Sequence, residues 1–277
     1  MAGVVAQVEK RLAELRVHHA EGTRTSVMTH VAWAPPKWAE AARKTLAGLE
    51  ELHPSRTILL FPQAGTRDEI GVDVELRCFT IPGSSREVCS EVIKLRLGGA
   101  RSRVPGSIVE PLLINDLPTF CRWRGLPPWG EPELEQLVDV CDRLVVDSSE
   151  WRGLPGAYRK LEALFERIAV SDIAWGRSLA WRGRLAALWP EIRRAETLAV
   201  TGPKADALLL LGWLRSRLRR DVRLSHRPAA RIERVAVDGE PVPVPRGPAR
   251  GPSELLSAEL DVFGRDPVYE AAVSAAR

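Results

Sequence analysis

The chain has 277 residues, of which 45% are apolar and 27% are charged, and its formal net charge is +4 at pH 7. This composition is typical of a globular protein large enough for one or two domains. No run reaches the roughly 18 consecutive apolar residues of a membrane span, and the charged first 20 residues lack the apolar core of a secretory signal, so we expect a cytoplasmic protein without membrane contact.

The basic excess does not predict nucleic-acid binding. Only six of the forty basic residues are lysines, an imbalance that biased codon usage also produces, and the carboxylates are interspersed among the arginines. Nucleic-acid-binding proteins usually concentrate their basic residues in a stripe or patch. We therefore expect no nucleic-acid partner and keep a nucleic-acid binder as the least favoured alternative.

The start of the chain predicts a helix followed by a β-α-β unit. Apolar residues recur at helical spacing over residues 3–20, and residues 25–33 are typical of a strand. Pro35-Pro36 begins a second helix, since proline is tolerated in a first turn; it ends near His53-Pro54, and residues 56–61 follow as a buried strand. This order normally gives two parallel strands joined by a right-handed crossover.

Two segments with alternating apolar and polar residues, 72–80 and 87–97, predict an antiparallel pair within a mixed sheet. We expect Gly83-Ser84-Ser85 to form the turn between them. The other elements expected in this half are a helix over residues 108–114, a strand over 119–123, a helix over about 133–141 and a strand over 143–147.

The second half predicts a more helical unit. Ser171-Asp172 is suited to cap a following helix, and Asp238-Gly239 between alternating segments is a strong hairpin signal. The expected elements are helices over residues 157–169, 175–189 and 204–219, a strand over 198–200, a hairpin within 232–244, and two terminal helical segments separated near Gly264.

These elements predict an α/β fold with a mixed, largely parallel sheet flanked by helices and a smaller α/β C-terminal unit. We expect an N-terminal helix within residues 1–24, an α/β domain over 25–150, and a helix-rich α/β unit over 151–277 with a β-hairpin near 231–244.

No motif for catalysis is found: the chain has no G-x-S-x-G elbow, P-loop, H-E-x-x-H or G-x-G-x-x-G after a strand. The nearest feature is Thr201-Gly202-Pro203-Lys204 between a predicted strand and helix, where helix N–H groups attract anions. Pro203 removes one donor, which favours a plain turn. Together with the acidic strand end at Asp147, this turn supports the alternative of an enzyme or sensor for a phosphorylated sugar or nucleotide.

Neither the cysteines nor the histidines predict a metal site or a cofactor. Cys78, Cys89, Cys121 and Cys141 include no C-x-x-C pair, and the five histidines form no cluster with them. We expect the cysteines to be buried, reduced thiols.

Tryptophan and arginine recur together along the chain. Trp123 lies between two arginines, and on the helix expected from Trp175, Arg177 and Arg184 share one side with Trp181. Both residue types are enriched at binding hot spots, and they pair through cation–π contacts. The alternative is that the tryptophans belong to the core and the arginines extend past them to solvent, and the sequence leaves both interpretations open.

Six segments resemble, in chain order, those of the glucose-6-phosphate dehydrogenase assembly protein family, OpcA, over roughly residues 25–220. Each segment alone is unspecific, but the common order makes a chance match improbable. The segments are His53-Pro54-Ser55-Arg56; Pro111-Leu112-Leu113 with Asp116-Leu117-Pro118; Trp123-Arg124-Gly125; Asp142-Arg143 with Val145-Val146-Asp147-Ser148-Ser149; Ser171-Asp172 with Ala174-Trp175-Gly176-Arg177 and Trp181-Arg182; and Leu211-Gly212-Trp213-Leu214 with Arg217-Leu218.

The resemblance implies a non-catalytic accessory protein that binds glucose-6-phosphate dehydrogenase, promotes its active oligomer and raises its response to substrate in the oxidative pentose phosphate pathway. It implies no catalytic residue and no cofactor. The candidate partner-interface residues are Trp123, Arg124, Trp175, Arg177, Trp181 and Arg182, and the further family-motif positions are His53, Ser55, Arg56, Asp116, Arg143, Asp147 and Ser148.

Overall fold

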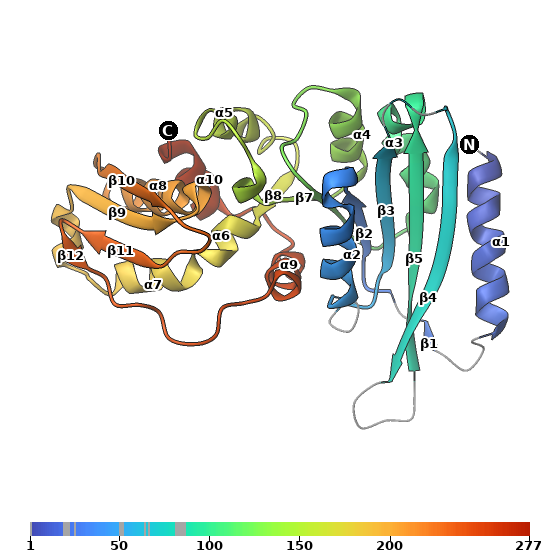
Figure 1. Ribbon diagram of the computed structural model, residues 1–277, viewed down its shortest axis with the longest axis horizontal. Coiled ribbons are helices and arrows are strands. Elements are labelled where there is room, and N and C mark those ends of the chain that lie inside the picture. The colour runs from blue at the N-terminus through green and yellow to red at the C-terminus, as the bar shows by residue number, and fades with distance from the viewer. Residues whose placement is uncertain are drawn as a thin grey trace. The chain divides into compact units, whose positions relative to one another are not determined.

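The chain divides into two units (Figure 1). The computed structural model describes residues 2–18, 23–24, 26–49, 53–63, 65, 67–80 and 87–277. One unit comprises Met1–Val146 with Pro252–Asp261, and the other comprises Asp147–Gly251 with Val262–Arg277. The chain therefore returns to the first unit for a single helix before it ends in the second. Thr25, where the first strand was expected to begin, and the expected turn at residues 83–85 lie outside the described residues.

The first unit contains the strands and helices of an α/β domain. The predicted N-terminal helix is confirmed, and so are the two predicted strands that precede and follow the second helix. Its elements are α1 (Ala2–His18), β1 (Thr23–Arg24), β2 (Thr29–Trp33), η1 (Pro36–Trp38), α2 (Ala39–Ala47), β3 (Arg56–Gln63), β4 (Ile70–Thr80), β5 (Glu87–Gly98), η2 (Gly99–Arg103), α3 (Pro105–Val109), η3 (Glu110–Leu112), β6 (Thr119–Trp123), α4 (Pro132–Val140), β7 (Arg143–Val146) and α9 (Pro252–Leu260).

The sheet of this unit is mixed and largely parallel, as predicted. Its strands follow the order β1-β5-β3-β2-β6-β7, each pair parallel, and β4 pairs antiparallel with β5. Helix α1 packs along β4, α2 packs against α9, and α3 packs against α4. The central strands are buried on both faces; the whole of β2, for example, is buried, which is usual where helices cover a parallel sheet.

The second unit is smaller and also α/β. The predicted helix of residues 204–219 and the two C-terminal helices are confirmed. Its elements are η4 (Ser148–Glu150), α5 (Gly156–Glu162), β8 (Ala169–Asp172), α6 (Ile173–Arg177), α7 (Leu179–Ala186), η5 (Glu191–Arg194), β9 (Thr197–Gly202), α8 (Lys204–Leu218), β10 (Arg223–Pro228), β11 (Arg234–Val237), β12 (Glu240–Pro241) and α10 (Pro267–Ala275).

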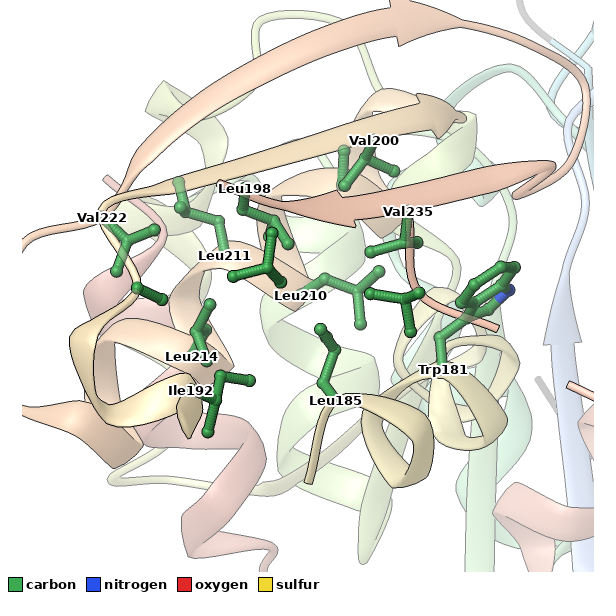
Figure 2. Packing of buried hydrophobic residues seen from close by; sticks show 14 residues of the cluster. Trp181, Leu185, Ile192, Leu198, Val200, Leu210, Leu211, Leu214, Val222 and Val235 are labelled. Carbon is green, nitrogen blue, oxygen red and sulfur yellow. The ribbon is translucent and has the colours of Figure 1, made fainter. Parts of the chain in front are cut away.

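A four-stranded sheet in the order β10-β9-β11-β12 covers the core of this unit. Figure 2 shows Leu198, Val200 and Val235 pointing from the sheet toward Leu210 and Leu211 of α8. The hairpin between β11 and β12 is confirmed, because Asp238 and Gly239 have φ angles of 48° and 89°, as a two-residue primed turn requires.

Two helix predictions in this unit are wrong in part. The helix expected over residues 157–169 ends at Glu162, and the strand β8 begins at Ala169. The helix expected over residues 175–189 is interrupted at Ser178, whose hydroxyl donates to the Trp175 carbonyl at 2.8 Å. The ψ angle of Ser178, −7°, departs from regular α-helix geometry, so the spacing argument for one helical face does not extend across it.

The expectation of four reduced thiols is wrong for two of the cysteines. Cys78 and Cys89 are register partners on the antiparallel strands β4 and β5 and form a disulfide. Cys121 and Cys141 are free and buried, as predicted. A hydrogen bond with Cys121, together with burial, raises the pKa of the Cys141 thiol well above its usual value.

Within the described residues, no helix combines the length and the apolar character needed to cross a membrane.

Candidate functional site

Trp33 and Trp123 form a stacked pair at the carboxyl ends of β2 and β6. The parallel register places the two residues side by side, and their rings lie 4.9 Å apart at an interplanar angle of 16°. β3 follows β2 in the chain and lies on one side of it, whereas the later strand β6 lies on the other. Open α/β sheets bind their ligands at such a switch point, so Trp123 marks the position in this unit where a binding site is expected.

Local packing explains the two residues that follow Trp123. The Arg124 amide donates to the Trp33 carbonyl at 3.0 Å, and its guanidinium donates to the Thr45 hydroxyl at 2.8 Å. Gly125 has a φ angle of 80°, which favours glycine, and a Cβ there would lie 2.9 Å from the Trp38 indole nitrogen. The Trp-Arg-Gly segment thus has a structural explanation in the contact between β6 and the α2 region.

A hollow of about 570 Å³ adjoins Trp33. Three prolines give it apolar walls, and three polar side chains supply an amide, a hydroxyl and a carboxylate. The Glu133 Oε2 atom is buried and has no hydrogen-bond partner among the described residues. This set of groups suits a binding site better than a hydrolytic site, because it contains no nucleophile paired with a base. The lining residues are Trp33, Pro35, Pro36, Pro62, Gln63, Ser102 and Glu133.

The motif at His53, Ser55 and Arg56 lies at the amino end of β3, the opposite end of the strand from the hollow. The His53 Nε2 atom is 2.7 Å from the Ser257 hydroxyl of α9, and the Ser55 hydroxyl is 3.3 Å from that of Thr57. The first contact joins the segment before β3 to α9, and the second joins that segment to the start of β3.

Arg56 forms a buried ion pair with Glu91 of β5, at 2.7 Å, and donates to the Leu112 carbonyl at 3.0 Å. Glu91 also accepts from Arg16 of α1. Burial acts to raise the pKa of Glu91, but the hydrogen bond from Arg16 and the charge of Arg56 outweigh it, so the pKa is lowered. The network joins strands and helices within the unit and leaves Arg56 a structural role.

The two other motif positions of this unit lie near the amino ends of the neighbouring strands β6 and β7. Asp116 is exposed in the loop before β6, with a φ angle of 66°. Arg143 is buried at the start of β7. Sequence reasoning missed His30 of β2, whose two ring nitrogens are buried without a hydrogen-bond partner among the described residues. Burial and the charge of Arg122 lower its pKa to about 3, so the ring is neutral.

In the second unit, the motif residues Asp147, Ser148 and Arg177 converge with Asp172 and Asp206. Arg177 donates to both carboxylate oxygens of Asp206, at 2.8 and 3.0 Å, and to Asp147 at 3.4 Å. The Ser148 amide donates to Asp172 at 3.0 Å. The five residues form one network, called here the aspartate cluster, although they come from η4 and the residue before it, β8, α6 and α8.

Asp172 organises the start of α6. Its Oδ1 atom accepts from the amides of Ser148 and Ala174, so the predicted helix cap is confirmed. Its Oδ2 atom accepts from the Tyr269 hydroxyl at 3.3 Å. Tyr158 completes this side, with its hydroxyl 3.2 Å from that of Ser148. Sequence reasoning missed Asp206 and both tyrosines; an aspartate in the first turn of the apolar helix α8 was the available signal.

The aspartate cluster holds more carboxylates than cations. Burial, and then the charge of Asp147, raise the pKa of Asp172 to about 7. Burial also raises the pKa of Asp206, although Arg177 opposes this. For Arg177, the hydrogen bonds that it donates to Asp206 and the charge of Asp147 outweigh burial and raise the pKa. Arg177 therefore stays charged, and Asp172 changes its protonation near neutral pH.

We predict that Asp172→Asn removes a pH dependence of stability. The folded pKa of about 7 lies above the ordinary value of 3.8, so folded Asp172 keeps a proton that the unfolded chain releases. The free energy of unfolding therefore falls as pH rises from about 4 to about 7, by at most on the order of 4 kcal/mol. The asparagine keeps the Oδ1 acceptor and should remove the contribution of Asp172 to this slope. Urea unfolding across this pH window measures it.

Asp116→Asn is the matched control, because Asp116 is exposed and asparagine tolerates its positive φ. It should follow the wild-type slope. Equal slopes for Asp172→Asn and the wild type would contradict the assigned protonation.

The candidate tryptophans of the second unit are buried. The Trp175 indole nitrogen donates to Asp266 at 2.9 Å, and the Arg182 guanidinium lies 3.3 Å from the centroid of the Trp175 ring system. Trp181 packs in the core with Leu185 (Figure 2). Trp123, Trp175 and Trp181 are each less than 10% exposed, which agrees with the alternative that they belong to the core. A partner contact at the candidate positions stays a prediction.

The turn at residues 201–204 has a structural explanation. A Cβ on Gly202 would lie 3.0 Å from the Ile232 Cα atom, so close packing accounts for the glycine. The helix that follows has no side-chain cap at Pro203. Within the described residues, no group of three or more His, Cys, Asp or Glu side chains is close enough to hold a metal ion.

Comparison with known proteins identifies the family. Residues 47–163 match the family described as the glucose-6-phosphate dehydrogenase subunit N-terminal domain, and residues 168–247 match the corresponding C-terminal domain. A protein of Nostoc punctiforme named "Putative OxPP cycle protein OpcA" is 31% identical over 177 residues, 60% of this chain and 38% of the relative. The equally named protein of Synechocystis is 28% identical over 216 residues, 72% of this chain and 44% of the relative.

The chain thus spans less than half the length of these curated relatives. The matches to the two domain models together cover most of the residues of both structural units. The chain belongs to the OpcA family.

Proposed function

We propose that this protein is a non-catalytic accessory protein of the cytoplasm that binds glucose-6-phosphate dehydrogenase and promotes its assembly and activation in the oxidative pentose phosphate pathway. The observation that carries the proposal is the match to both domains described for a glucose-6-phosphate dehydrogenase subunit. The name of the relatives, which refers to the OxPP cycle, supports the same pathway.

Activation requires that the protein bind the active form of the dehydrogenase more tightly than the inactive form, because equal affinity for both shifts no equilibrium. A coupling free energy of about 1–3 kcal/mol corresponds to about 5–150-fold tighter substrate binding. Among the candidate interface residues, Arg124, Arg177 and Arg182 are partly exposed. In this proposal they supply polar contacts; Arg182 is held over the Trp175 ring and Arg177 by its hydrogen bonds to Asp206.

The test is the glucose-6-phosphate saturation curve of the dehydrogenase from the same cell, measured with and without this protein. We expect the half-saturating concentration to fall by about 5-fold or more, in line with a coupling of at least 1 kcal/mol, and the two proteins to co-elute from a sizing column. An unrelated protein of the same net charge serves as the control. An unchanged curve together with separate elution would refute the proposal.

A further inference from the structure

The four-stranded sheet of the second unit has one face that packs on helices and one outer face. Leu198 and Val200 of β9 are buried in the core. Side chains alternate along a strand, so Thr197, Ala199 and Thr201 point to the outer face, and all three are partly exposed. The side chains on the neighbouring strands that share this face follow from the register.

Arginines flank these small residues. On β10, Arg223 pairs with Thr197 and Arg227 pairs with Thr201; on the other side, Arg234 of β11 also pairs with Thr201. All three arginines are exposed. Two strand spacings separate Arg227 from Arg234, about 10 Å between their backbones. These three residues are called here the arginine face.

The surrounding segment strengthens the positive charge. Residues 217–234 contain seven exposed arginines and two carboxylates, a local charge of +5, whereas the whole chain carries +4. None of the seven forms an ion pair with a described residue; the neighbouring Asp221 pairs with Arg215 instead, at 2.8 Å. The exposed arginines are Arg217, Arg219, Arg220, Arg223, Arg227, Arg231 and Arg234.

The geometry points to the arginine face as a docking surface for a carboxylate-rich surface of a protein partner. This inference rests on the proposed function, in which that partner is the dehydrogenase. Guanidinium groups bind carboxylates in a bidentate manner, and a concentrated positive charge accelerates association with an acidic surface. The small residues between the arginines leave room for the partner's side chains. The tryptophans of the family motifs are buried and uncharged, so they do not present a charged surface of this kind.

A protein partner suits this face better than a single-stranded nucleic acid. Proteins that bind single strands stack the bases on aromatic side chains, and the outward positions of β9, β10 and β11 hold only arginine, serine, threonine and alanine. The face recognises negative charge, and its outward positions present no aromatic ring on which a base could stack.

The test compares two variants of the full chain that have the same net charge. One is Arg223→Ser/Arg227→Ser/Arg234→Ser; the control, Arg11→Ser/Arg67→Ser/Arg101→Ser, removes three exposed arginines of the first unit. We expect the arginine-face variant to bind the dehydrogenase at least about 10-fold more weakly, with slower association and a weaker salt dependence. The control variant should bind as the wild type does, and both variants should keep the wild-type melting temperature.

Each other outcome has a definite meaning. If the wild type binds the dehydrogenase and the arginine-face variant binds equally well, the docking inference is overturned and the proposed function stands. If the wild type does not bind, the proposed function fails, and this inference fails with it. Tighter binding of the wild type to a short DNA duplex, lost in the arginine-face variant, would assign the face to nucleic acid. Self-association of that variant, without loss of affinity, would show that the arginines only protect the edge strand β10.

Discussion

Gly212→Ala should lower the free energy of unfolding by about 3 kcal/mol or more. Gly212 lies in α8 where α10 crosses it, and a Cβ at this position would lie 2.0 Å from the Ala272 carbonyl oxygen and 2.9 Å from the Ala276 Cβ atom. The closest of these atoms belongs to the backbone, so α10 would have to move away from α8. The gain in helix propensity from glycine to alanine, about 1 kcal/mol, does not offset this displacement. Urea unfolding of the full chain measures the effect.

Gly183→Ala is the matched control for this substitution. Gly183 also lies within a helix, α7, but a Cβ there would meet no atom within 4 Å. We expect this variant to be up to about 1 kcal/mol more stable than the wild type, because the helix gains propensity without crowding. Equal unfolding midpoints for the two variants would contradict the close approach of α8 and α10.

Arg177→Ala should cost about 3–5 kcal/mol of stability near neutral pH, as removal of one partner from a buried ion pair usually does. Asp206 is inaccessible to solvent, and Arg177 supplies both of its charged hydrogen bonds. Without Arg177, the pKa of the folded Asp206 rises further above 3.8. The loss should therefore shrink as pH falls toward about 4, since the carboxyl group is then neutral in the folded state at little cost.

Two further variants test this explanation. Arg177→Ala/Asp206→Asn should recover much of the lost stability, because it removes the unpaired charge. Arg184→Ala, at a partly exposed arginine of α7, should change stability by no more than about 0.5 kcal/mol. If the double variant is as unstable as Arg177→Ala at neutral pH, the loss comes from packing and not from the buried charge.

Features that depend on short stretches of chain were predictable. The N-terminal helix, the β-α-β unit, the cap at Asp172 and the hairpin at Asp238-Gly239 all follow from spacing or from turn chemistry over a few residues. The strands β8 and β10 were missed. The first follows a helical segment without a clear break, and the second is exposed and carries arginines where an apolar residue would have marked a strand.

In the candidate sites, too, the local motifs were predictable and the long-range contacts were not. The motifs containing Asp147 and Arg177 were recognisable in the sequence, but their meeting with Asp206, which lies 59 and 29 positions further on, was not, because no local pattern relates residues so far apart. The same holds for the pairing of Cys78 with Cys89, which depends on the exact register of β4 and β5.

The sequence by itself determined the fold class, the order of most elements and the family, because each rests on local periodicity or on motifs read along the chain. Only the tertiary structure decided which side chains meet and which face solvent. In the structure, the tryptophans that the sequence suggested for an interface are buried, and Arg223, Arg227 and Arg234 lie on one face of a sheet. The physical reason is that burial and contact depend on the path of the whole chain, whereas propensity acts over a few residues.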